Sequence, residues 1–401
     1  MDDIVVIGAG QAGASLVAKL RAQGFTGALT LIGDEPVLPY ERPPLSKGYL
    51  LGQSNVEKLT LRPQSYYDDA QITVLTGTRV TAIDRERHLV VTDDAEIGYG
   101  QLALTTGSFA RALSAEQGGG LKGVFTVRTL ADVDAMRPGM HDKARVLVVG
   151  GGYIGLEAAA VASKLGCSVT LIEQGPRILG RVAAAETANY FRALHREHGI
   201  DMREGVGLDT LDGTDSVQSA TLSDGTTLDV DCVIVGIGID PATGLAEAAG
   251  LTVDNGIKTD ALGQTSDPAI WSAGDCASFP FRDQRIRLES VQNAIDQAEA
   301  VAANMLGAAK PYNPFPWFWS DQYDCKLQIA GLCTGYDAVV TRGAGARMSV
   351  WYYRGDTLLA VDAMNDARSY MVGKRMLEVG VSPHAEAVAD PSSNLKQLLK
   401  S

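Results

Sequence analysis

Cysteine is scarce in this chain and absent before position 167. The five cysteines, at positions 167, 232, 276, 325 and 333, include no Cys-x-x-Cys pair. That spacing excludes an iron–sulfur cluster of the usual kind and a redox-active disulfide early in the chain. We therefore interpret all five as reduced structural thiols, as expected for a protein of a reducing compartment.

Long apolar runs and basic segments are also missing. The longest apolar runs, such as residues 146–149, are far too short to span a bilayer. The acidic start Met1-Asp2-Asp3 carries no positive region of a signal peptide. The net charge is -13, and no Lys/Arg-rich stretch predicts a nucleic-acid site. We expect a cytoplasmic protein that binds neither membranes nor nucleic acid.

Two glycine fingerprints are present instead, each between an apolar run and a helix-forming stretch. Their glycines are Gly8, Gly10 and Gly13, and then Gly150, Gly152 and Gly155, with Tyr153 and Ile154 inside the second motif. In such a motif the first glycine makes a tight turn, the second admits a pyrophosphate, and the third lets helix and strand pack closely. The helix N-terminus then offers N–H groups to the phosphates. Two such units predict two dinucleotides and an enzyme that moves electrons between them.

The 401 residues suit two or three domains. We predict an α/β fold with two Rossmann-like dinucleotide-binding domains and a C-terminal α+β domain. The second domain is inserted in the first. The expected boundaries are 1–108 and 241–316 for the first domain, 109–240 for the second, and 317–401 for the third. Helices are expected near 11–23, 153–165, 183–198, 289–306 and 366–378, and the strands of the third domain at 326–332, 338–341, 348–353 and 357–363.

Acidic residues after the second strand of each unit are candidates for ribose binding. Glu173 lies about 20 residues past the second glycine turn, where a carboxylate accepts from a ribose 2′-OH and repels a 2′-phosphate. It favours NADH over NADPH, although Arg177 lies close by. In the first unit the corresponding candidate is Glu35. The alternative for Glu173 is a solvated acid at a strand end.

The Pro-rich loop after the first unit carries two basic candidates. Arg42 is suited to a phosphate, and Lys47 to a place near flavin N5, where it would stabilise the anion formed on reduction. Glu157 is expected to face the flavin and pair with Lys47. The alternatives are an exposed lysine at a helix end and an acid placed by the helix dipole alone.

Further candidates lie in the second half of the chain. Asp275 is placed to accept from a ribityl hydroxyl, or else to cap a helix. A helix that starts near Ser290 would direct the N–H groups of Val291 and Gln292 at the flavin N1/O2 edge. Trp319, in an aromatic cluster with Trp317, is expected either beside the flavin or in the core.

Several blocks together resemble one family. They are VVIGAGQAG, LPYERPPLSKGYL, VLVVGGGYIGLEAAA, VTLIEQGPRILGR, VIVGIGIDP, SAGDCASF, ESVQNAIDQA and FWSDQYDCKLQIAGL. In this order they resemble the oxygenase-coupled, NADH-dependent ferredoxin reductases of the glutathione-reductase superfamily. The resemblance covers essentially the whole chain.

The resemblance implies FAD on the first fingerprint and NADH on the second. It also implies a two-iron, two-sulfur ferredoxin as electron acceptor, which would supply a haem monooxygenase or a Rieske dioxygenase. It places the first glycines, Arg42, Lys47, Asp275 and Trp319 around FAD, and the second glycines with Glu173 around NAD. Glu157 would lie at the contact between nicotinamide and flavin.

The chain departs from the family pattern at two turns. The usual Ala-Thr-Gly is Thr105-Thr106-Gly107 here, and we expect Thr106 to keep its place beside the cofactor. The turn that contains Gly238 has Asp240 and Ala242 where relatives often have a basic residue and an asparagine. This difference leaves open how the turn holds the nicotinamide half of NADH.

Two other functions are compatible with parts of this pattern. An NADH oxidase or peroxidase of the same superfamily would need a cysteine near residues 46–47, where there is none. A flavoprotein of the apoptosis-inducing-factor type would be expected to carry targeting segments and basic patches. Because such ferredoxins are usually acidic, we also expect a local basic docking face. Its candidates are Arg282, Arg285, Arg287, Arg342, Arg347, Lys374 and Arg375.

Overall fold

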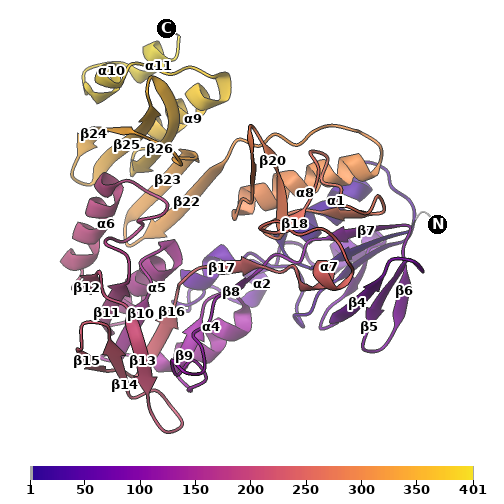
Figure 1. Cartoon of the computed structure of the whole chain (residues 1–401), viewed down its shortest axis with the longest axis horizontal. Helices are drawn as coiled ribbons and strands as arrows, with labels where there is room; N and C mark the ends of the chain where they lie inside the picture. Colours follow the sequence, from indigo (N-terminus) through magenta and orange to yellow (C-terminus); the bar gives the residue numbers. More distant parts are fainter. Residues whose placement is uncertain (1–2, 401) are drawn as a thin grey trace. The chain divides into compact units, whose positions relative to one another are not determined.

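The computed structural model describes residues 3–400, which form two compact units (Figure 1). The first unit comprises the chain up to Arg42 together with Asn55–Phe109 and Ile239–Pro316. The second comprises Pro43–Ser54, Ala110–Gly238 and the chain from Trp317. Among residues 3–400, no helix has the length and apolar character needed to cross a membrane.

A parallel five-stranded sheet is the centre of the first unit. Its strand order is β19 (Ile270–Ser272), β7 (Gln101–Leu104), β1 (Ile4–Ile7), β2 (Leu29–Ile32) and β3 (Thr73–Leu75). Although β19 lies some 170 residues beyond β7 in the sequence, the two strands pair directly, Trp271 opposite Ala103. The carboxyl ends of β1, β7 and β19 therefore meet at one edge of this sheet.

Both faces of that sheet are covered, as its unbroken apolar strands require. Helices α1 (Gln11–Ala22) and α8 (Val291–Met305) pack side by side and bury Val6 from one face (Figure 1). The opposite face, with Val5, packs against the antiparallel strands β4 (Val80–Asp84), β5 (Leu89–Thr92) and β6 (Glu96–Gly98). The strand alternation thus divides the core of this unit into two layers.

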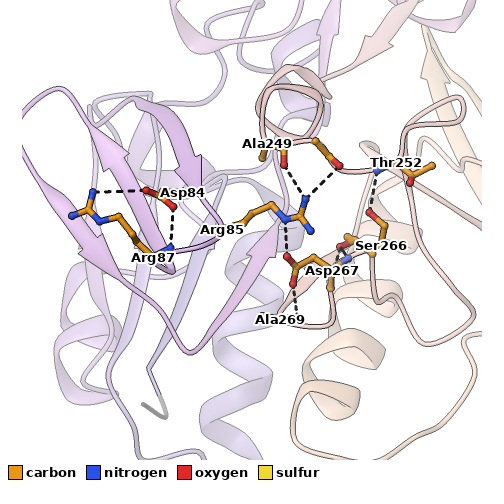
Figure 2. Close-up of polar contacts among 10 residues, drawn as sticks. Asp84, Arg85, Arg87, Ala249, Thr252, Ser266, Asp267 and Ala269 are labelled. Atoms are coloured by element: carbon orange, nitrogen blue, oxygen red, sulfur yellow. Dashed lines mark hydrogen bonds and ion pairs between the residues drawn. The ribbon is translucent and has the colours of Figure 1, made fainter.

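An arginine joins the β4–β5 hairpin to the returning segment of this unit. Arg85 donates from Nε to Asp267 at 2.7 Å and from Nη1 to the carbonyl of Ala249 at 3.2 Å (Figure 2). The remaining elements of the unit are α2 (Val56–Leu59), α3 (Gln64–Asp69), β17 (Ile239–Pro241), α7 (Gly244–Ala248), β18 (Ile257–Lys258), β20 (Ala277–Phe281) and β21 (Gln284–Ile286). Strand β8 (Ser108–Ala110) crosses the boundary between the two units.

The second unit contains another parallel sheet. Its order is β12 (Asp201–Glu204), β11 (Ser168–Glu173), β10 (Arg145–Val149), β16 (Cys232–Val235) and β9 (Val124–Thr126). Its helices are α4 (Leu130–Met136), α5 (Tyr153–Lys164) and α6 (Ala185–Glu197), and β13 (Leu208–Asp212), β14 (Ser219–Leu222) and β15 (Thr227–Asp229) form a separate meander. The strand order reverses at β10, so the crevice between β10 and β16 is where a nucleotide is expected to bind.

The same unit ends in an antiparallel sheet with helices. Its order is β22 (Trp317–Gln322), β23 (Cys325–Gly331), β26 (Thr357–Met364), β25 (Arg347–Arg354) and β24 (Ala338–Ala344). Helices α9 (Ala367–Val379), α10 (Ala385–Ala389) and α11 (Leu395–Leu398) follow. Trp351, Val361 and Met376 are fully buried between this sheet and α9.

The α/β class and the long elements are confirmed, with ends that differ by one to three residues. Helix α6, for example, starts at Ala185 rather than at 183. Strands β6 and β22 and the β20–β21 hairpin were not predicted, and residues 317–322 were interpreted only as an aromatic cluster. These strands are short or lie at a sheet edge, so their alternation carries little signal.

Candidate functional site

The glycines of the first fingerprint fit a bound dinucleotide. A Cβ on Gly8 would lie 2.2 Å from the carbonyl oxygen of Thr105, and one on Gly13 would lie 2.0 Å from the oxygen of Gly8. Gly8 also has a φ of +111°, which side chains rarely adopt. A Cβ on Gly10, the N-cap of α1, would meet nothing within 4 Å. The outer glycines are thus needed for packing, and the middle one opens the space that a pyrophosphate requires.

The second fingerprint repeats this arrangement. A Cβ on Gly150 would lie 2.4 Å from the oxygen of Gly236, and one on Gly155 would lie 2.1 Å from the oxygen of Gly150. Gly152, the N-cap of α5, again leaves open space within 4 Å. Each unit therefore has a parallel sheet, a cradle without side chains and a helix N-terminus, which together suit a dinucleotide.

Threonine and aspartate residues occupy the sheet edge beside the first cradle. Thr106 Oγ1 donates to the carbonyl of Ala242 at 2.7 Å. Asp275 Oδ2 accepts from Ser108 at 3.1 Å, directly after Gly274, whose φ is +85°. The structure thus brings Thr106 and Asp275 to the edge where β7 and β19 end, as their positions after these strands predict.

Glu35 and Arg42 bind each other in this unit. Arg42 Nη2 lies 2.7 Å from Glu35 Oε1, and Tyr40 donates to Glu35 Oε2 at 2.7 Å. Glu35 is predicted to bind a ribose and Arg42 a phosphate, and this mutual contact was not predicted. The ion pair neutralises much of the charge with which either side chain would meet a nucleotide.

Helix α8 starts where the sequence analysis expects it. Ser290 caps it, accepting the N–H of Asn293 at 3.1 Å. The N–H groups of Val291 and Gln292 belong to the first turn, so they have no carbonyl partner within the helix. Gln292 Nε2 donates to Asp296 at 2.6 Å, so this amide group is directed along the helix.

The carboxylate of Glu173 accepts two backbone N–H groups, one from the second fingerprint and one from the turn after its own strand. Its Oε2 accepts the N–H of Gly151, inside the fingerprint, at 2.8 Å, and its Oε1 accepts that of Gly175 at 2.6 Å. Arg177 donates to the carbonyl of Ala183 at 2.7 Å and so points into its own loop. The carboxylate is thus fixed beside the second fingerprint, and Arg177, the nearby arginine considered for a 2′-phosphate, is directed into its own loop.

The predicted ion pair between Lys47 and Glu157 is present. Lys47 Nζ lies 2.7 Å from Glu157 Oε2, and the Glu157 side chain is 3 % exposed. Ser46 also donates to Oε2 at 2.7 Å, and Ser320 donates to Oε1 at 2.6 Å. Lys47 is therefore not the exposed lysine of the alternative interpretation. Neither serine was predicted as a site residue, although their neighbours Lys47 and Trp319 were candidates.

Strand β22 explains how the aromatic cluster is divided. Phe318 contacts the Tyr153 ring, with ring centroids 4.9 Å apart, on the face that also carries Ser320. Trp317 and Trp319 lie on the other face, with ring centroids 5.8 Å apart, and both are half-buried. The hydroxyl of Tyr153 is buried although the residue is partly exposed, and Ile154 is 44 % exposed.

Gly238 has two arginines beside it. A Cβ on Gly238 would lie 3.7 Å from both Arg111 Nη1 and Arg181 Nη2. Since Gly238 has a φ of +113° and follows β16, it lies at the carboxyl edge where the nicotinamide half is expected. Two arginines from other segments thus lie beside the turn that lacks a basic residue of its own.

The candidates for a basic docking face are largely engaged locally. Arg342 donates to the carbonyls of Val388, Pro391 and Ser393, so it holds the C-terminal segment. The others have these neighbours: Arg282 lies over Phe281, Lys374 lies over Trp317, Arg285 lies near Asp254, Arg287 pairs with Glu289, Arg347 with Asp366, and Arg375 with Glu378. The docking face stays a prediction, and Arg342 differs from the other candidates in that its guanidinium also holds the C-terminal segment.

These features define a class of protein: an oxidoreductase with two dinucleotide sites in one chain. Residues 2–298 match the family model described as pyridine nucleotide-disulphide oxidoreductase, and residues 317–399 match that described as reductase C-terminal. The chain belongs to the pyridine nucleotide-disulphide oxidoreductase family, whose members use FAD and a pyridine nucleotide.

Known proteins match this chain over almost its whole length. It is 43% identical over 404 residues to the 5,5'-dehydrodivanillate O-demethylase ferredoxin reductase subunit of Sphingobium sp. (99% of this chain, 98% of the relative). It is 40% identical over 408 residues to putidaredoxin reductase CamA of Pseudomonas putida (99% and 97%). The crystal structure of the covalent putidaredoxin reductase–putidaredoxin complex matches with a TM-score of 0.96 at 40% identity, covering 100% of this chain and 98% of that one.

Proposed function

We propose that this protein is an NADH-dependent ferredoxin reductase. It takes electrons from NADH and passes them through FAD to a two-iron, two-sulfur ferredoxin that supplies an oxygenase. The observation that carries the proposal is the pair of open glycine cradles in a chain whose full-length relatives are named as ferredoxin reductases.

The two cradles are assigned to the two cofactors in chain order. FAD belongs to the first unit, on Gly8, Gly10 and Gly13, with Thr106 and Asp275 at the same sheet edge. NADH belongs to the second, on the cradle around Gly152. When bound, FAD accepts electrons in pairs from NADH and releases them singly, and the protein contributes binding, orientation and electrostatics.

NADH is preferred to NADPH because of the fixed carboxylate of Glu173. It accepts from a ribose 2′-OH, and it repels a 2′-phosphate that Arg177 is not positioned to neutralise. Near Gly238, Arg181 has no ion-pair or hydrogen-bond partner among the described residues, which leaves it available for the phosphates of NADH.

The Lys47–Glu157 pair is assigned to the reduction step. Glu157 lies on α5, the helix that the second fingerprint opens, one turn beyond Tyr153. A protonated lysine held by this carboxylate stabilises negative charge that develops nearby during reduction. The transfer of electrons from NADH requires neither a general base nor a nucleophile from this pair.

A second function, the NADH oxidase or peroxidase, is not favoured. The first unit has a single cysteine, Cys276, which is fully buried with its Sγ 3.5 Å from the carbonyls of Leu104 and Ala273. Residues 46–47, where those enzymes need a thiol, are serine and lysine in this chain. The free thiols also agree with a cytoplasmic location, which we propose with the function.

The test is anaerobic. The purified yellow protein is mixed with NADH, or with NADPH in a parallel sample, and flavin absorbance is followed before and after addition of an oxidised two-iron ferredoxin. We expect fast bleaching with NADH alone and then reduction of the ferredoxin. Bleaching that leaves the ferredoxin oxidised would instead indicate an oxidase or an NADH-sensing flavoprotein.

A further inference from the structure

A chain of hydrogen bonds lies behind Glu157, inside the second unit. Ser320 Oγ donates to Glu157 Oε1 at 2.6 Å, and Gln322 Nε2 lies 3.2 Å from Ser320 Oγ. Gln322 Oε1 lies 2.8 Å from His195 Nε2, and His195 Nδ1 lies 3.4 Å from the hydroxyl of Tyr323. Four contacts thus connect Tyr323 to the carboxylate that binds Lys47.

The chain has only one consistent direction. Because the Glu157 carboxylate accepts from Lys47, it can only accept from Ser320 as well. The single hydroxyl hydrogen of Ser320 is then used, so Ser320 must accept from the amide nitrogen of Gln322. The amide oxygen of Gln322 consequently faces His195, and the imidazole must carry its hydrogen on Nε2. Every donor in the chain therefore points toward Glu157.

Ser320, Gln322 and His195 come from strand β22 and helix α6, and their side chains are shielded from water. Ser320 and Gln322 stand two residues apart on β22, on the face that packs against α5, and both are fully buried. His195 comes from α6 and is also fully buried, and burial lowers its pKa to about 4. A neutral imidazole has one donor and one acceptor nitrogen, as this chain requires.

We propose that Ser320, Gln322 and His195 are positioning residues for the Lys47–Glu157 pair. Their one-way chain fixes Glu157 Oε1, so that Oε2 remains turned to Lys47. This inference rests on the proposed role of that pair in reduction by NADH. It also gives the C-terminal sheet a part in the reaction, because β22 supplies the last donor to a carboxylate on the NADH-binding helix.

The direction of the chain is tested by nitrogen-15 NMR of the FAD-loaded protein with labelled histidines. The His195 signals are assigned by their loss in His195→Gln. We expect the Nε2–H tautomer, with Nδ1 bare and no charge on the ring between pH 6 and 8. A ring that carries its hydrogen on Nδ1, or that is charged at pH 7, would overturn the chain as described.

The positioning role is tested by a double-mutant cycle on the rate of flavin reduction by NADH. Ser320→Ala is expected to slow reduction about 10-fold in the wild-type background, because small displacements of a reacting group are costly. In Glu157→Gln it should add less than about two-fold, since the group it positions is changed. The hydroxyl of Ser349, a buried serine in the same sheet, bonds only to Trp351 among the described residues, so Ser349→Ala is the matched control.

The outcomes separate this inference from the proposed function. Equal slowing by Ser320→Ala in both backgrounds, or a similar loss in Ser349→Ala, would mean that Ser320 acts only on the fold and would overturn the inference. No slowing by Glu157→Gln would overturn the role of the pair and the positioning role together. If the flavin is reduced normally but the ferredoxin is not, the proposed function is contradicted and the positioning role is not.

Discussion

Lys47 and Glu157 are 110 residues apart in the chain, and Lys47 Nζ lies 2.7 Å from Glu157 Oε2. The carboxylate is almost fully buried, whereas the lysine side chain is 21 % exposed. A buried carboxylate of this kind needs its donors, and three of them are present: Lys47, Ser46 and Ser320. The relationship therefore joins the Pro-rich loop, helix α5 and the C-terminal sheet in one polar cluster.

Removal of the positive member should affect chemistry more than binding. Lys47→Met is expected to slow reduction of the flavin by NADH about 10-fold or more, because a preorganised charge is lost. The dissociation constant for NADH should change less than two-fold. Stopped-flow absorbance over a range of NADH concentrations separates the two. Lys58→Met, at an exposed lysine on α2, serves as the control and should match the wild type.

The glycines of the second fingerprint should respond differently to alanine. Gly152→Ala adds a methyl group to open space, so the fold should persist while NADH binding weakens at least 10-fold. Gly155→Ala forces a Cβ to within 2.1 Å of a backbone oxygen, so it should destabilise the unit by several kcal/mol (~3). Thermal unfolding and NADH titration distinguish them. Gly120→Ala also enters open space, but away from the fingerprint, and should change neither property.

Nucleotide preference is expected to depend on the charge of Glu173. Glu173→Gln keeps an acceptor for Gly151 or Gly175 but removes the repulsion of a 2′-phosphate. The ratio of kcat/KM for NADH to that for NADPH should fall about 10-fold, or about 1.4 kcal/mol. Steady-state kinetics with both nucleotides measures it. An unchanged ratio, equal to that of the exposed control Glu197→Gln, would show that the preference arises elsewhere.

Two arginines two residues apart should differ in their contribution to stability. Arg85 is half-buried and bonds Asp267 and a backbone carbonyl (Figure 2). Arg87 is 61 % exposed and pairs with Glu96 and with Asp84, of which Figure 2 draws the contact with Asp84. Arg85→Met should lower the free energy of unfolding by about 1–3 kcal/mol, because it leaves a partly buried carboxylate without its cation. Arg87→Met should lower it by less than about 1 kcal/mol. Urea denaturation measures both, and equal losses would contradict this account.

The pH dependence of stability should reveal a buried acid. Asp362 is 1 % exposed and accepts from Thr187 at 2.8 Å and from Tyr352. Burial raises the pKa of Asp362 to about 6, against the opposing effect of those hydrogen bonds. The folded state thus holds this proton more tightly than the unfolded chain, so the stabilisation is full below about pH 4 and is lost as pH rises through 6.

Substitution of that acid isolates its contribution. Relative to wild type, Asp362→Asn should gain stability between pH 4 and 7, by up to about 3 kcal/mol for a shift of about two pKa units. Unfolding free energies of both proteins at five pH values give the difference. His195 has the opposite sign: burial lowers its pKa to about 4, so its contribution is lost as pH falls from 6.5 toward 4. A difference between wild type and Asp362→Asn that does not vary with pH would contradict the assignment.

The two nucleotide-binding units can be predicted from the sequence because their motifs are local. Gly8 and Gly150 each follow an apolar strand and precede a helix, and this context alone predicts the cradles that the structure contains. The pairing of Lys47 with Glu157 was also predicted, since both residues flank recognisable motifs. Such features depend on short stretches of chain and on chemistry that few arrangements can satisfy.

Other features depend on side-chain directions and could not be predicted in this way. Ser320 and Gln322 bond to Glu157 and His195 only because β22 turns its even-numbered positions toward α5 and α6. Tyr153 stands in the fingerprint, yet its ring packs on Phe318. The mutual pairing of Glu35 and Arg42 is similar, because each residue alone suits a nucleotide. These outcomes are settled by packing between distant segments, for which local propensity gives no information.

The most direct test of the central claim is an electron count. Under argon, a catalytic amount of the protein is given a limiting, known amount of NADH and an excess of oxidised two-iron ferredoxin. NADH carries two electrons and the ferredoxin takes one, so we predict two ferredoxins reduced for each NADH consumed, and far slower reduction with NADPH. Bleaching of the flavin by NADH while the ferredoxin stays oxidised would contradict the assignment of this protein as a ferredoxin reductase.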